Sequence, residues 1–405
     1  LLFGYTWRNS KKHTTVQYPA AMSWIQFNTV QGWLVNVKPE FSKYDGDMRT
    51  RFWRAEGLLN YGFSEKKMRG GLRLERRFES KHFSTVELSG GLQTAQFSDK
   101  DPIGVVTNTM YSLMIKRNYM KLYEKKFVKA EFSRYLFPGL WMRADAEWAE
   151  RNPLVNHSDY ALYKKDRVYT PNAPLTGSAE PSFNTHQAFV VNLMARFRIG
   201  ETYNSYPKFR VYESSGWPEI LLIYRKAIAG VGGSDLNYDY IQAQIRKNDI
   251  NFGLVGYTEL NIAVGMFLND KRLEFIDLHH PMGNQTIFGK PKDYSRAFFL
   301  LPYYDFSTSK PFVQTHIQHH LQGWLLDKIP GLRKLNWKEV FGFGLYYAEN
   351  TANEGLLPQK TPYWEVNFGF ENIGFKFFRP FRIDVAAGFF GKEHYKTGVV
   401  IGIDL

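Results

Sequence analysis

Apolar and polar residues alternate along most of the chain, and a period of two is typical of strands with two unlike faces. Between Trp53 and Phe63 every second residue is apolar or small, while Arg54, Glu56 and Asn60 lie on the opposite face. The same alternation sets Met142, Ala144, Ala146 and Trp148 against Arg143, Asp145 and Glu147, and Trp364, Val366, Phe368 and Phe370 against Glu365, Asn367 and Glu371. Helical periodicity is scarce. The pattern therefore predicts a protein built almost entirely from strands.

The predicted strands are long. Arg51–Phe63, His82–Phe97, Phe252–Asn269 and Pro311–Trp324 all exceed ten residues, whereas strands of soluble proteins usually have about five or six. Strands that cross an outer membrane need about 9–11 residues, with apolar side chains towards lipid. Aromatic residues also gather near predicted strand ends, as in the interfacial girdles of such barrels: Tyr135, Phe137, Trp141, Trp324 and Trp337. We therefore predict an all-β fold, a transmembrane antiparallel up-and-down β-barrel in a Gram-negative outer membrane, in preference to a soluble all-β protein.

The connections between predicted strands fall into a long set and a short set. The long set is Ser98–Arg117, Arg151–Thr185, Asn269–Phe306 and Asn350–Thr361, and the short set is Glu79–His82, Phe137–Gly139, Lys247–Asn251 and Asn372–Gly374. Thr397–Leu405 alternates like a closing strand that ends at the periplasmic rim, so the long set is expected to be extracellular. Gly200–Gly216 and Leu325–Asn336 are exceptions, long connections on the periplasmic side. We count about 16 strands from residue 13 onward; because Leu1–Trp7 also alternates, about 14 or 18 remain alternatives.

Length and composition agree with a barrel. A chain of 405 residues fits one large barrel, and its first residues hold neither an initiator Met nor a signal peptide. We therefore expect residues 1–405 to be the barrel of a longer precursor, without an N-terminal periplasmic region. Aromatic residues make up 17% of the chain, which excludes a disordered protein. The absence of Cys excludes disulfides, thiolate zinc sites and Cys nucleophiles.

The chain carries a net charge of +13, which alone would suggest a nucleic acid or an anionic membrane as partner. Nucleic-acid binding requires basic residues interleaved with exposed stacking aromatics. Here the aromatics alternate into the predicted lipid face. The expected partners are therefore outer-membrane lipid and lipopolysaccharide, with no nucleic acid.

Charges of both signs are predicted to line the interior as an ion-pair network: Arg54, Glu56, Arg73, Glu75, Lys129, Glu131, Arg143, Asp145 and Glu147. His316, Gln318, His320 and Gln322 share one face of a predicted strand and extend this polar lining. His279 and His280 fall in a long predicted loop, where a surface position is expected. The sequence contains no metalloprotease, serine-hydrolase or phosphate-loop motif. We predict no catalytic residue, metal or cofactor.

Several stretches resemble a known family. They are Gly4–Ser10 (GYTWRNS), Phe27–Trp33 (FNTVQGW), His316–Leu335 (HIQHHLQGWLLDKIPGLRKL) and Trp337–Val340 (WKEV). Together they are similar to the C-terminal barrel of a Bacteroidota outer-membrane family known as domain of unknown function 5686. The resemblance implies an N-terminal signal and a carboxypeptidase-regulatory-like domain, shared with SusC-type transporters, in the full-length protein. It implies no catalytic residues, because none is established for the family.

The segment after Trp324 has a pattern of its own. Ile329, Leu332 and Leu335 are spaced three apart, with Lys328, Arg333 and Lys334 beside them. This suits a short amphipathic turn at the membrane interface, flanked by Trp324 and Trp337. A periplasmic turn with solvated charges is the alternative.

Three functions remain open. The preferred hypothesis is a non-enzymatic barrel subunit of a larger outer-membrane complex for protein assembly, export or surface display, with other outer-membrane proteins and lipoproteins as partners. A solute channel or transporter is the second, because about 16 strands can enclose an aqueous pore. An outer-membrane hydrolase is the third, motivated only by the loop histidines and by carboxylates near the rim.

Overall fold

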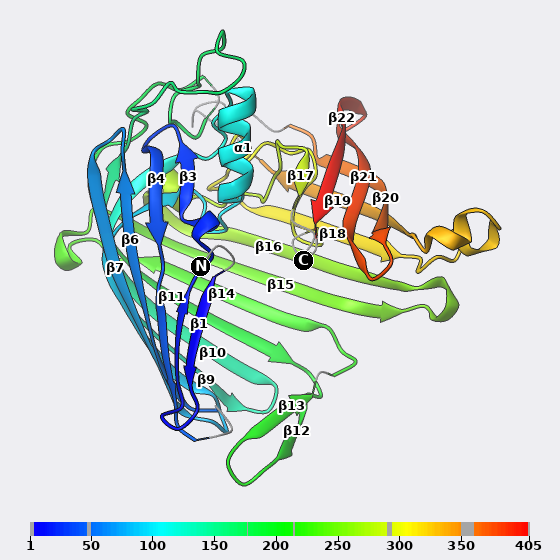
Figure 1. Ribbon diagram of the computed structural model, residues 1–405, viewed down its shortest axis with the longest axis horizontal. Helices are drawn as coiled ribbons and strands as arrows, with labels where there is room; N and C mark the ends of the chain where they lie inside the picture. Colours follow the sequence, from blue (N-terminus) through cyan, green and yellow to red (C-terminus); the bar gives the residue numbers. More distant parts are fainter. Residues whose placement is uncertain are drawn as a thin grey trace. The chain divides into compact units, whose positions relative to one another are not determined.

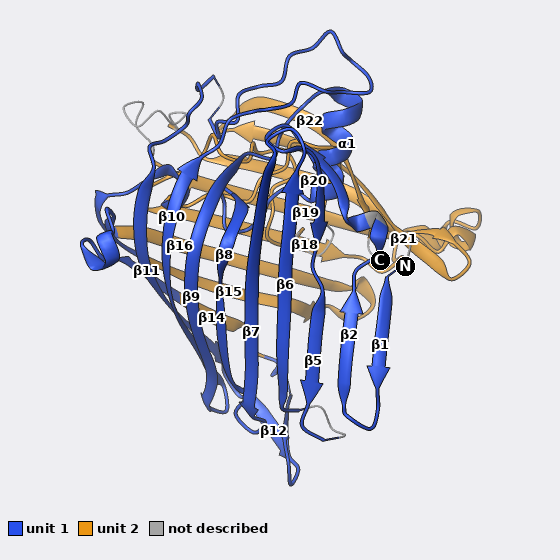
Figure 2. Ribbon diagram, turned by 60° about the vertical axis from the view of Figure 1, so that its left-hand side comes forward, with its two compact units in different colours: residues 1–216, 223–240, 268–277 blue, residues 217–222, 241–267, 278–405 orange. Residues whose placement is uncertain are grey.

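The computed structural model describes residues 4–46, 50–175, 177–213, 215–289, 294–349 and 360–403, and nearly all its elements are strands (Figure 1). The chain divides into two compact units (Figure 2). Unit 1 comprises residues 1–216, 223–240 and 268–277, and unit 2 comprises residues 217–222, 241–267 and 278–405. No helix among the described residues is both long enough and apolar enough to pass through a bilayer.

Unit 1 is an antiparallel sheet whose strands pair in the order β1–β2–β5–β6–β7–β8–β9–β10–β11. β3 pairs with β4, and β4 pairs with β6 beyond β5. Its elements are β1 (Tyr5–Asn9), β2 (Thr14–Tyr18), η1 (Ala21–Ser23), β3 (Ile25–Asn28), β4 (Gly32–Val37), β5 (Glu40–Tyr44), β6 (Phe52–Gly62), β7 (Lys67–Glu79), β8 (Ser84–Gln96), α1 (Val105–Ile115), β9 (Leu122–Phe137), β10 (Leu140–Pro153), β11 (His186–Arg198), β12 (Thr202–Ser205), β13 (Arg210–Glu213), η2 (Val231–Gly233) and η4 (Phe275–Asp277).

Unit 2 is also an antiparallel sheet, with the order β16–β18–β19–β20–β21–β22. β14 (Glu219–Ala227), β15 (Asn237–Asn251) and β16 (Tyr257–Arg272) have residues in both units. The remaining elements are η3 (Gly253–Val255), β17 (Phe288–Gly289), β18 (Phe312–His320), η6 (Leu326–Lys328), η7 (Leu332–Leu335), β19 (Lys338–Ala348), β20 (Tyr363–Phe375), β21 (Phe378–Phe390) and β22 (Glu393–Ile403).

Two pairs of short strands are halves of longer ones. β4 and β5 pair with successive parts of β6, and Pro39, which lacks the N–H that a ladder needs, lies between them. β2 and β3 are related in the same way around η1. With each pair taken as one strand, and with β12, β13 and β17 set apart, sixteen strands run from β2 onward in the described chain, preceded by β1. Neither unit closes into a ring through its own described pairings.

The alternation seen in the sequence is realised as two unlike faces. In unit 1, Trp53 is 52% exposed and Val128 is 64% exposed, while Arg54 and Lys129 lie on the opposite, polar face. In unit 2, Val366 and Phe368 are exposed, and Glu365 and Asn367 are buried. Monomeric soluble proteins rarely expose a continuous apolar surface of this kind. We refer to the two sides as the apolar face and the polar face.

Several predicted boundaries are wrong, each for a local reason. Ser98–Arg117 lies in the connection between β8 and β9, as predicted, but this connection contains the helix α1, which ends where Lys116 takes a left-handed conformation. The strand predicted to reach Trp324 stops at His320, because Gln322 and Gly323 both have positive φ. Lys247–Asn251 belongs to β15, and the turn follows at η3, next to left-handed Gly253 and Gly256.

Two further connections differ or fall outside the structure. The turn predicted at Asn372–Gly374 lies a few residues later, at left-handed Lys376, because β20 continues to Phe375. Most of the Asn350–Thr361 loop, and the last two residues of the closing strand, lie outside the described residues. The predicted turn at Glu79–His82 is confirmed. There the Glu79 side chain accepts hydrogen bonds from the His82 N–H (3.1 Å) and the Ser84 hydroxyl (2.8 Å).

Elements from the connections cover strand edges within each unit. In unit 1, the Thr109 hydroxyl of α1 accepts a hydrogen bond from the Phe27 N–H (3.1 Å) and donates one to the Phe27 carbonyl (3.2 Å), so α1 lies beside β3 (Figure 1). In unit 2, β17 pairs in parallel with β22, and the Ile401 N–H donates to the Ile287 carbonyl at 2.6 Å. Covering an edge in this way prevents it from pairing with another chain.

The long connection Gly200–Gly216 folds into the hairpin β12–β13. Tyr212 of this hairpin stacks on Tyr135 of β9, with ring centroids 4.1 Å apart. Arg210 Nη1 lies 3.2 Å from Nε2 of His82, and the Tyr212 hydroxyl donates to the Lys81 carbonyl (3.1 Å). The hairpin is therefore fixed against the β7–β8 turn of unit 1.

Candidate functional site: charge-paired polar faces

Oppositely charged side chains pair across neighbouring strands on the polar face of unit 1. Arg54 lies 3.0 Å from Glu75 and 3.1 Å from Glu40. Arg73 lies 2.7 Å from Glu87 and 4.0 Å from Glu56. The register explains these pairs, because Arg54 stands opposite Glu75, and Arg73 stands opposite Glu56. Of the predicted network, this part of the sheet therefore brings together Arg54, Glu56, Arg73 and Glu75.

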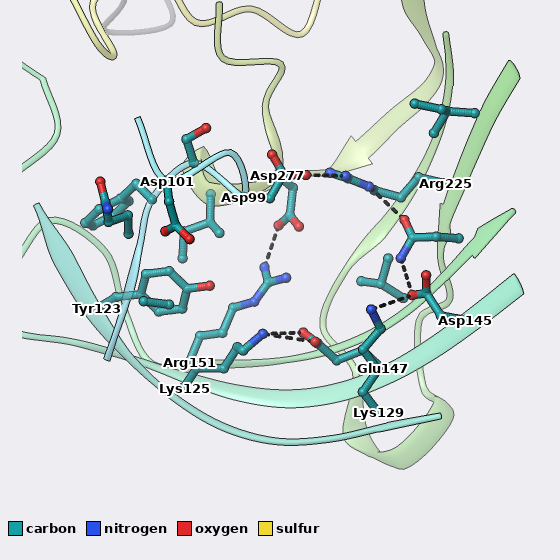
Figure 3. A pocket seen from close by; sticks show the side chains of 18 of the residues that line it. Asp99, Asp101, Tyr123, Lys125, Lys129, Asp145, Glu147, Arg151, Arg225 and Asp277 are labelled. Carbon is teal, nitrogen blue, oxygen red and sulfur yellow. Dashed lines mark hydrogen bonds and ion pairs between the residues drawn. The ribbon is translucent and has the colours of Figure 1, made fainter. Parts of the chain in front are cut away.

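A cavity of about 460 Å³ lies on the same face, between β8–β11 and the loops of unit 1 (Figure 3). Arg151 forms an ion pair with Asp277 (2.7 Å) in which both side chains are buried. Lys125 binds Glu147 (2.9 Å), and Arg225 binds Asp99 (2.8 Å). Figure 3 shows these pairs around the cavity.

The predicted residues Lys129, Glu131, Arg143 and Asp145 extend this arrangement. Lys129 lies 3.2 Å from Glu131 and 3.7 Å from Asp145, and Arg143 lies 3.9 Å from Asp145. Asn192 donates to Asp145 (2.8 Å) and accepts from Arg225 (2.9 Å), so it links the pairs of Asp145 to the Arg225–Asp99 pair. Five acidic residues line the cavity: Asp99, Asp101, Asp145, Glu147 and Asp277. Five basic residues line it as well: Lys125, Lys129, Arg143, Arg151 and Arg225. The cavity wall therefore carries no net charge.

Unit 2 has its own polar cluster, built on β18. His316, Gln318 and His320 are buried on one face of this strand, as predicted, while Gln322 lies beyond its end. Gln318 accepts from Arg382 (2.7 Å), which also forms two hydrogen bonds with Asp384 (2.7 and 2.8 Å).

The two histidines of this cluster have different surroundings. His320 lies 3.1 Å from Glu371 and stacks on Tyr257, with centroids 4.5 Å apart. His316 packs against Phe298, with centroids 4.3 Å apart. A cavity of about 410 Å³ adjoins His320 and Arg382. Within the described chain, no group of three or more His, Cys, Asp or Glu side chains is placed to hold a metal ion.

The long connection between β16 and β18 folds onto the polar face of unit 2. The Glu365 carboxylate accepts hydrogen bonds from the N–H groups of Phe299 (2.6 Å) and Leu300 (3.1 Å) and from the Tyr363 hydroxyl (2.7 Å). Phe298 and Leu301 are almost completely buried. This connection thus occupies the polar face instead of extending into solvent.

The expected surface position of His279 and His280 is therefore wrong. Both are buried, because the loop that carries them folds inward. His279 stacks on Phe312, with centroids 3.5 Å apart, and His280 Nδ1 lies 2.6 Å from the Ser307 hydroxyl. Ser307 is itself fully buried and donates to the Tyr304 carbonyl (2.6 Å). The contacts are those of a packed loop core.

The β8–β9 connection (residues 97–121) and the described part of the β10–β11 connection (residues 154–185) fold together into a surface called the cap, in which polar groups pair with one another. Lys116 binds Asp159 (2.8 Å), and the Tyr169 hydroxyl donates to the Ser112 carbonyl (2.7 Å). Lys121 donates to the Thr170 hydroxyl (2.8 Å) and the Pro171 carbonyl (2.6 Å). Burial lowers the pKa of Lys121 to about 8, and burial also raises the pKa of Tyr169.

The predicted interface residues lie at one end of unit 2. Trp324 is exposed, and Lys328 Nζ sits 3.9 Å from the centroid of its ring. Arg333 and Lys334 are exposed on η7, and Trp337 is half-buried against Phe370. The segment for which a short amphipathic turn was predicted forms two short 3₁₀ helices, η6 and η7.

The sequence did not assign Arg151, Arg225, Asp277 and Arg382 to these networks, whereas alternation had already placed Glu365 on the polar side of its strand. The alternation Ile383, Val385, Ala387 and Phe389 already sets Asp384 on the opposite face, and extending it by two residues would have found Arg382. Asp277 and Asp99 could not have been found, because they lie in connections, where no periodicity indicates which way a side chain points.

Comparisons with known proteins agree with this architecture. The model for the C-terminal domain of a family of unknown function, DUF5686, matches residues 1–370. The chain belongs to the DUF5686 family. Among curated proteins, none matches this DUF5686 chain.

The solved structures that align with the DUF5686 chain include BamA and opdK. BamA from Haemophilus ducreyi, in a form lacking POTRA domains 1–3, aligns over 98% of this chain and 74% of its own, with 8% identity and a TM-score of 0.50. The outer membrane protein opdK from Pseudomonas aeruginosa aligns over 96% of both chains, with 8% identity and a TM-score of 0.33. The likeness to BamA shows that this DUF5686 domain has the fold of an outer-membrane β-barrel.

Proposed function

We propose that this chain resides in the outer membrane as a barrel without enzymatic activity, and that it serves as a subunit of a larger complex for protein assembly, export or surface display. The observation that carries the proposal is the occupied polar face. In unit 1 its charges are paired with one another, and in unit 2 a folded loop is anchored on it by Glu365. Side chains paired in this way support a structural role for the polar face, which is what we expect of a barrel without enzymatic activity.

Membrane placement is supported by the apolar face. Exposed Trp, Leu, Val and Phe side chains alternate with polar or small residues along many of the strands, which is the arrangement that hydrocarbon requires. The partners proposed are other outer-membrane proteins and lipoproteins, together with the surrounding lipid and lipopolysaccharide.

The test is affinity purification of the full-length protein from its native membrane in mild detergent, followed by identification of the co-purifying chains. We expect outer-membrane proteins or lipoproteins in fixed proportion. Full function of the purified barrel alone, with no such partners, would refute the proposal.

Matched variants would show which surface binds the partner. Tyr206→Ser with Val211→Ser changes exposed apolar residues of the β12–β13 hairpin region. Tyr163→Ser with Val168→Ser does the same in the cap of unit 1. If only one of the two double variants loses the partner, the surface changed in that variant is the binding surface.

The second candidate is a solute channel, and the polar cavity of unit 1 favours it. Because the lining charges balance, such a channel would discriminate weakly between anions and cations. Planar-bilayer recordings test this directly. A steady conductance with weak ion selectivity would support the channel, and silence across many insertions would remove it.

A further inference from the structure

A basic, aromatic surface lies at the end of unit 2 where β18, β19, β20 and β21 are connected. It consists of Trp324–Lys338 and Asn372–Arg379, here called the basic platform. The Asn372 side chain donates to the Asn336 carbonyl (2.6 Å), and Arg379 donates to the Leu335 carbonyl, so the two segments form one surface. The Glu339 carboxylate, which is buried, accepts from the Leu326 N–H and anchors the platform to β19.

The apolar side chains of the platform are unusually exposed. Phe377 is 104% exposed, Phe375 76% and Phe378 61%. Ile329, Leu332 and Leu335 are also exposed, on and beside η7. An exposed patch of six large apolar side chains indicates a surface that contacts a membrane or another protein.

The cations of the platform are not neutralised by the protein. Its two segments contain six basic residues and one acidic residue. Lys328, Arg333, Lys334 and Lys376 form no ion pair within the described part of the chain; Lys328 and Lys376 instead lie over the rings of Trp324 (3.9 Å) and Phe375 (5.5 Å). A cation held over an aromatic ring at a surface keeps its charge available to an outside anion.

The platform continues the apolar face. The Trp337 ring lies 6.0 Å from Phe370, Phe370 lies 5.0 Å from Phe368, and Phe368 lies 4.7 Å from Phe341. The apolar surface that includes Phe341 and Phe368 therefore continues into the platform, so the same surroundings contact both.

We propose that the basic platform binds anionic phospholipid of the periplasmic leaflet. Lys328, Arg333, Lys334 and Lys376 contact the headgroup phosphates, and Phe375, Phe377 and Phe378 enter the acyl chains. Continuity with the apolar face and the unpaired charge together favour lipid over an acidic protein. This inference rests on the proposed placement in the outer membrane.

The lipid-binding test uses the chain reconstituted in nanodiscs of phosphatidylethanolamine with phosphatidylglycerol, and it counts retained phosphatidylglycerol by native mass spectrometry. Arg333→Gln with Lys334→Gln should weaken retention about fivefold for each cation removed. The matched control, Lys164→Gln with Lys165→Gln, removes two adjacent exposed cations from the cap and should leave retention unchanged. Equal retention in both double variants would overturn the proposal.

A second measurement tests insertion of the aromatic residues. The chain has no Cys, so Phe377→Cys can carry a single environment-sensitive fluorophore, with Val128→Cys as the reference on the apolar face. We expect both labels to be quenched by brominated lipid. If iodide quenches the label at position 377 while brominated lipid quenches the label at position 128, lipid binding by the platform is refuted but the membrane placement is not. Iodide quenching at both positions refutes the membrane placement itself. If the label at position 377 is protected from iodide only when a co-purified protein is present, the surface binds a protein partner and not lipid.

Discussion

Glu365 shows how one side chain can fix a long connection. Its two oxygens accept three hydrogen bonds, two of them from consecutive backbone N–H groups of the loop that lies on the polar face of unit 2. A buried N–H that loses its acceptor costs about 1–3 kcal/mol.

We therefore expect Glu365→Gln to destabilise the loop by about 1–3 kcal/mol, because the amide nitrogen cannot accept from Phe299 or Leu300. Limited proteolysis should then cut between residues 278 and 310 at lower protease concentration. Glu131→Gln, a half-buried carboxylate paired with Lys129, is the control and should change stability by less than about 1 kcal/mol. Unaltered protection in Glu365→Gln would contradict the anchoring role.

The buried ammonium of Lys121 makes the cap of unit 1 sensitive to pH. Its pKa is lowered to about 8 in the folded cap, from an ordinary 10.5. Between these values the unfolded loop binds more protons than the folded one, so stability rises with pH across this window and is constant below it. Proteolysis of the cap, corrected for the protease's own pH profile, should slow from pH 8 towards 10. Lys121→Met should abolish that dependence, and a slope that persists in this variant would assign it to another group.

At the residue scale the sequence predicted which positions carry inward charge, but not which charges meet. Arg54 and Glu75 could be placed on one face by alternation alone. Arg151 and Asp277 could not be paired, because a strand and a distant connection meet only through the tertiary fold.

At the scale of elements, α1 and β17 are the parts that alternation could not predict. α1 begins with two Val and alternates Thr with Asn, residues that favour helices poorly, so its helical form depends on packing against β3. The displaced turns have a common cause as well: Gln322 and Lys376 adopt left-handed conformations that the residue type does not announce.

The covering of the β3 edge by α1 can be tested with an isosteric change. Thr109→Val removes both hydrogen bonds to Phe27 and keeps the volume, and each bond contributes about 1 kcal/mol. We expect the Phe27 amide to exchange hydrogen at least about tenfold faster. Thr107→Val, on the same helix, should leave that rate unchanged. Equal exchange rates in the two variants would mean that Thr109 does not hold the edge.

At the scale of the whole molecule, the apolar face determines whether the protein is stable in lipid or in water. Leu72, near the middle of β7, is half-exposed on that face, while Gln93 lines the polar cavity of unit 1. Placing Arg at position 72 should cost about 2–4 kcal/mol in a bilayer.

Urea unfolding in lipid vesicles measures this difference. Gln93→Arg, which introduces the same charge beside water and carboxylates, should change stability by less than about 1 kcal/mol. If Leu72→Arg proved as mild as its control, the apolar face would not be lipid-facing. The fold class was predictable at this scale because alternation repeats along many of the long strands, so local errors at turns do not change it.

The parallel contact of β17 with β22 also bears on the order of folding. Phe288 is held by Ile401, which is made far later in the chain, so the loop between β16 and β18 cannot reach its final position until the last strand is in place. Docking of this loop on the polar face of unit 2 is thereby coupled to completion of the sheet, and we expect that face to stay uncovered until the final strand is in place.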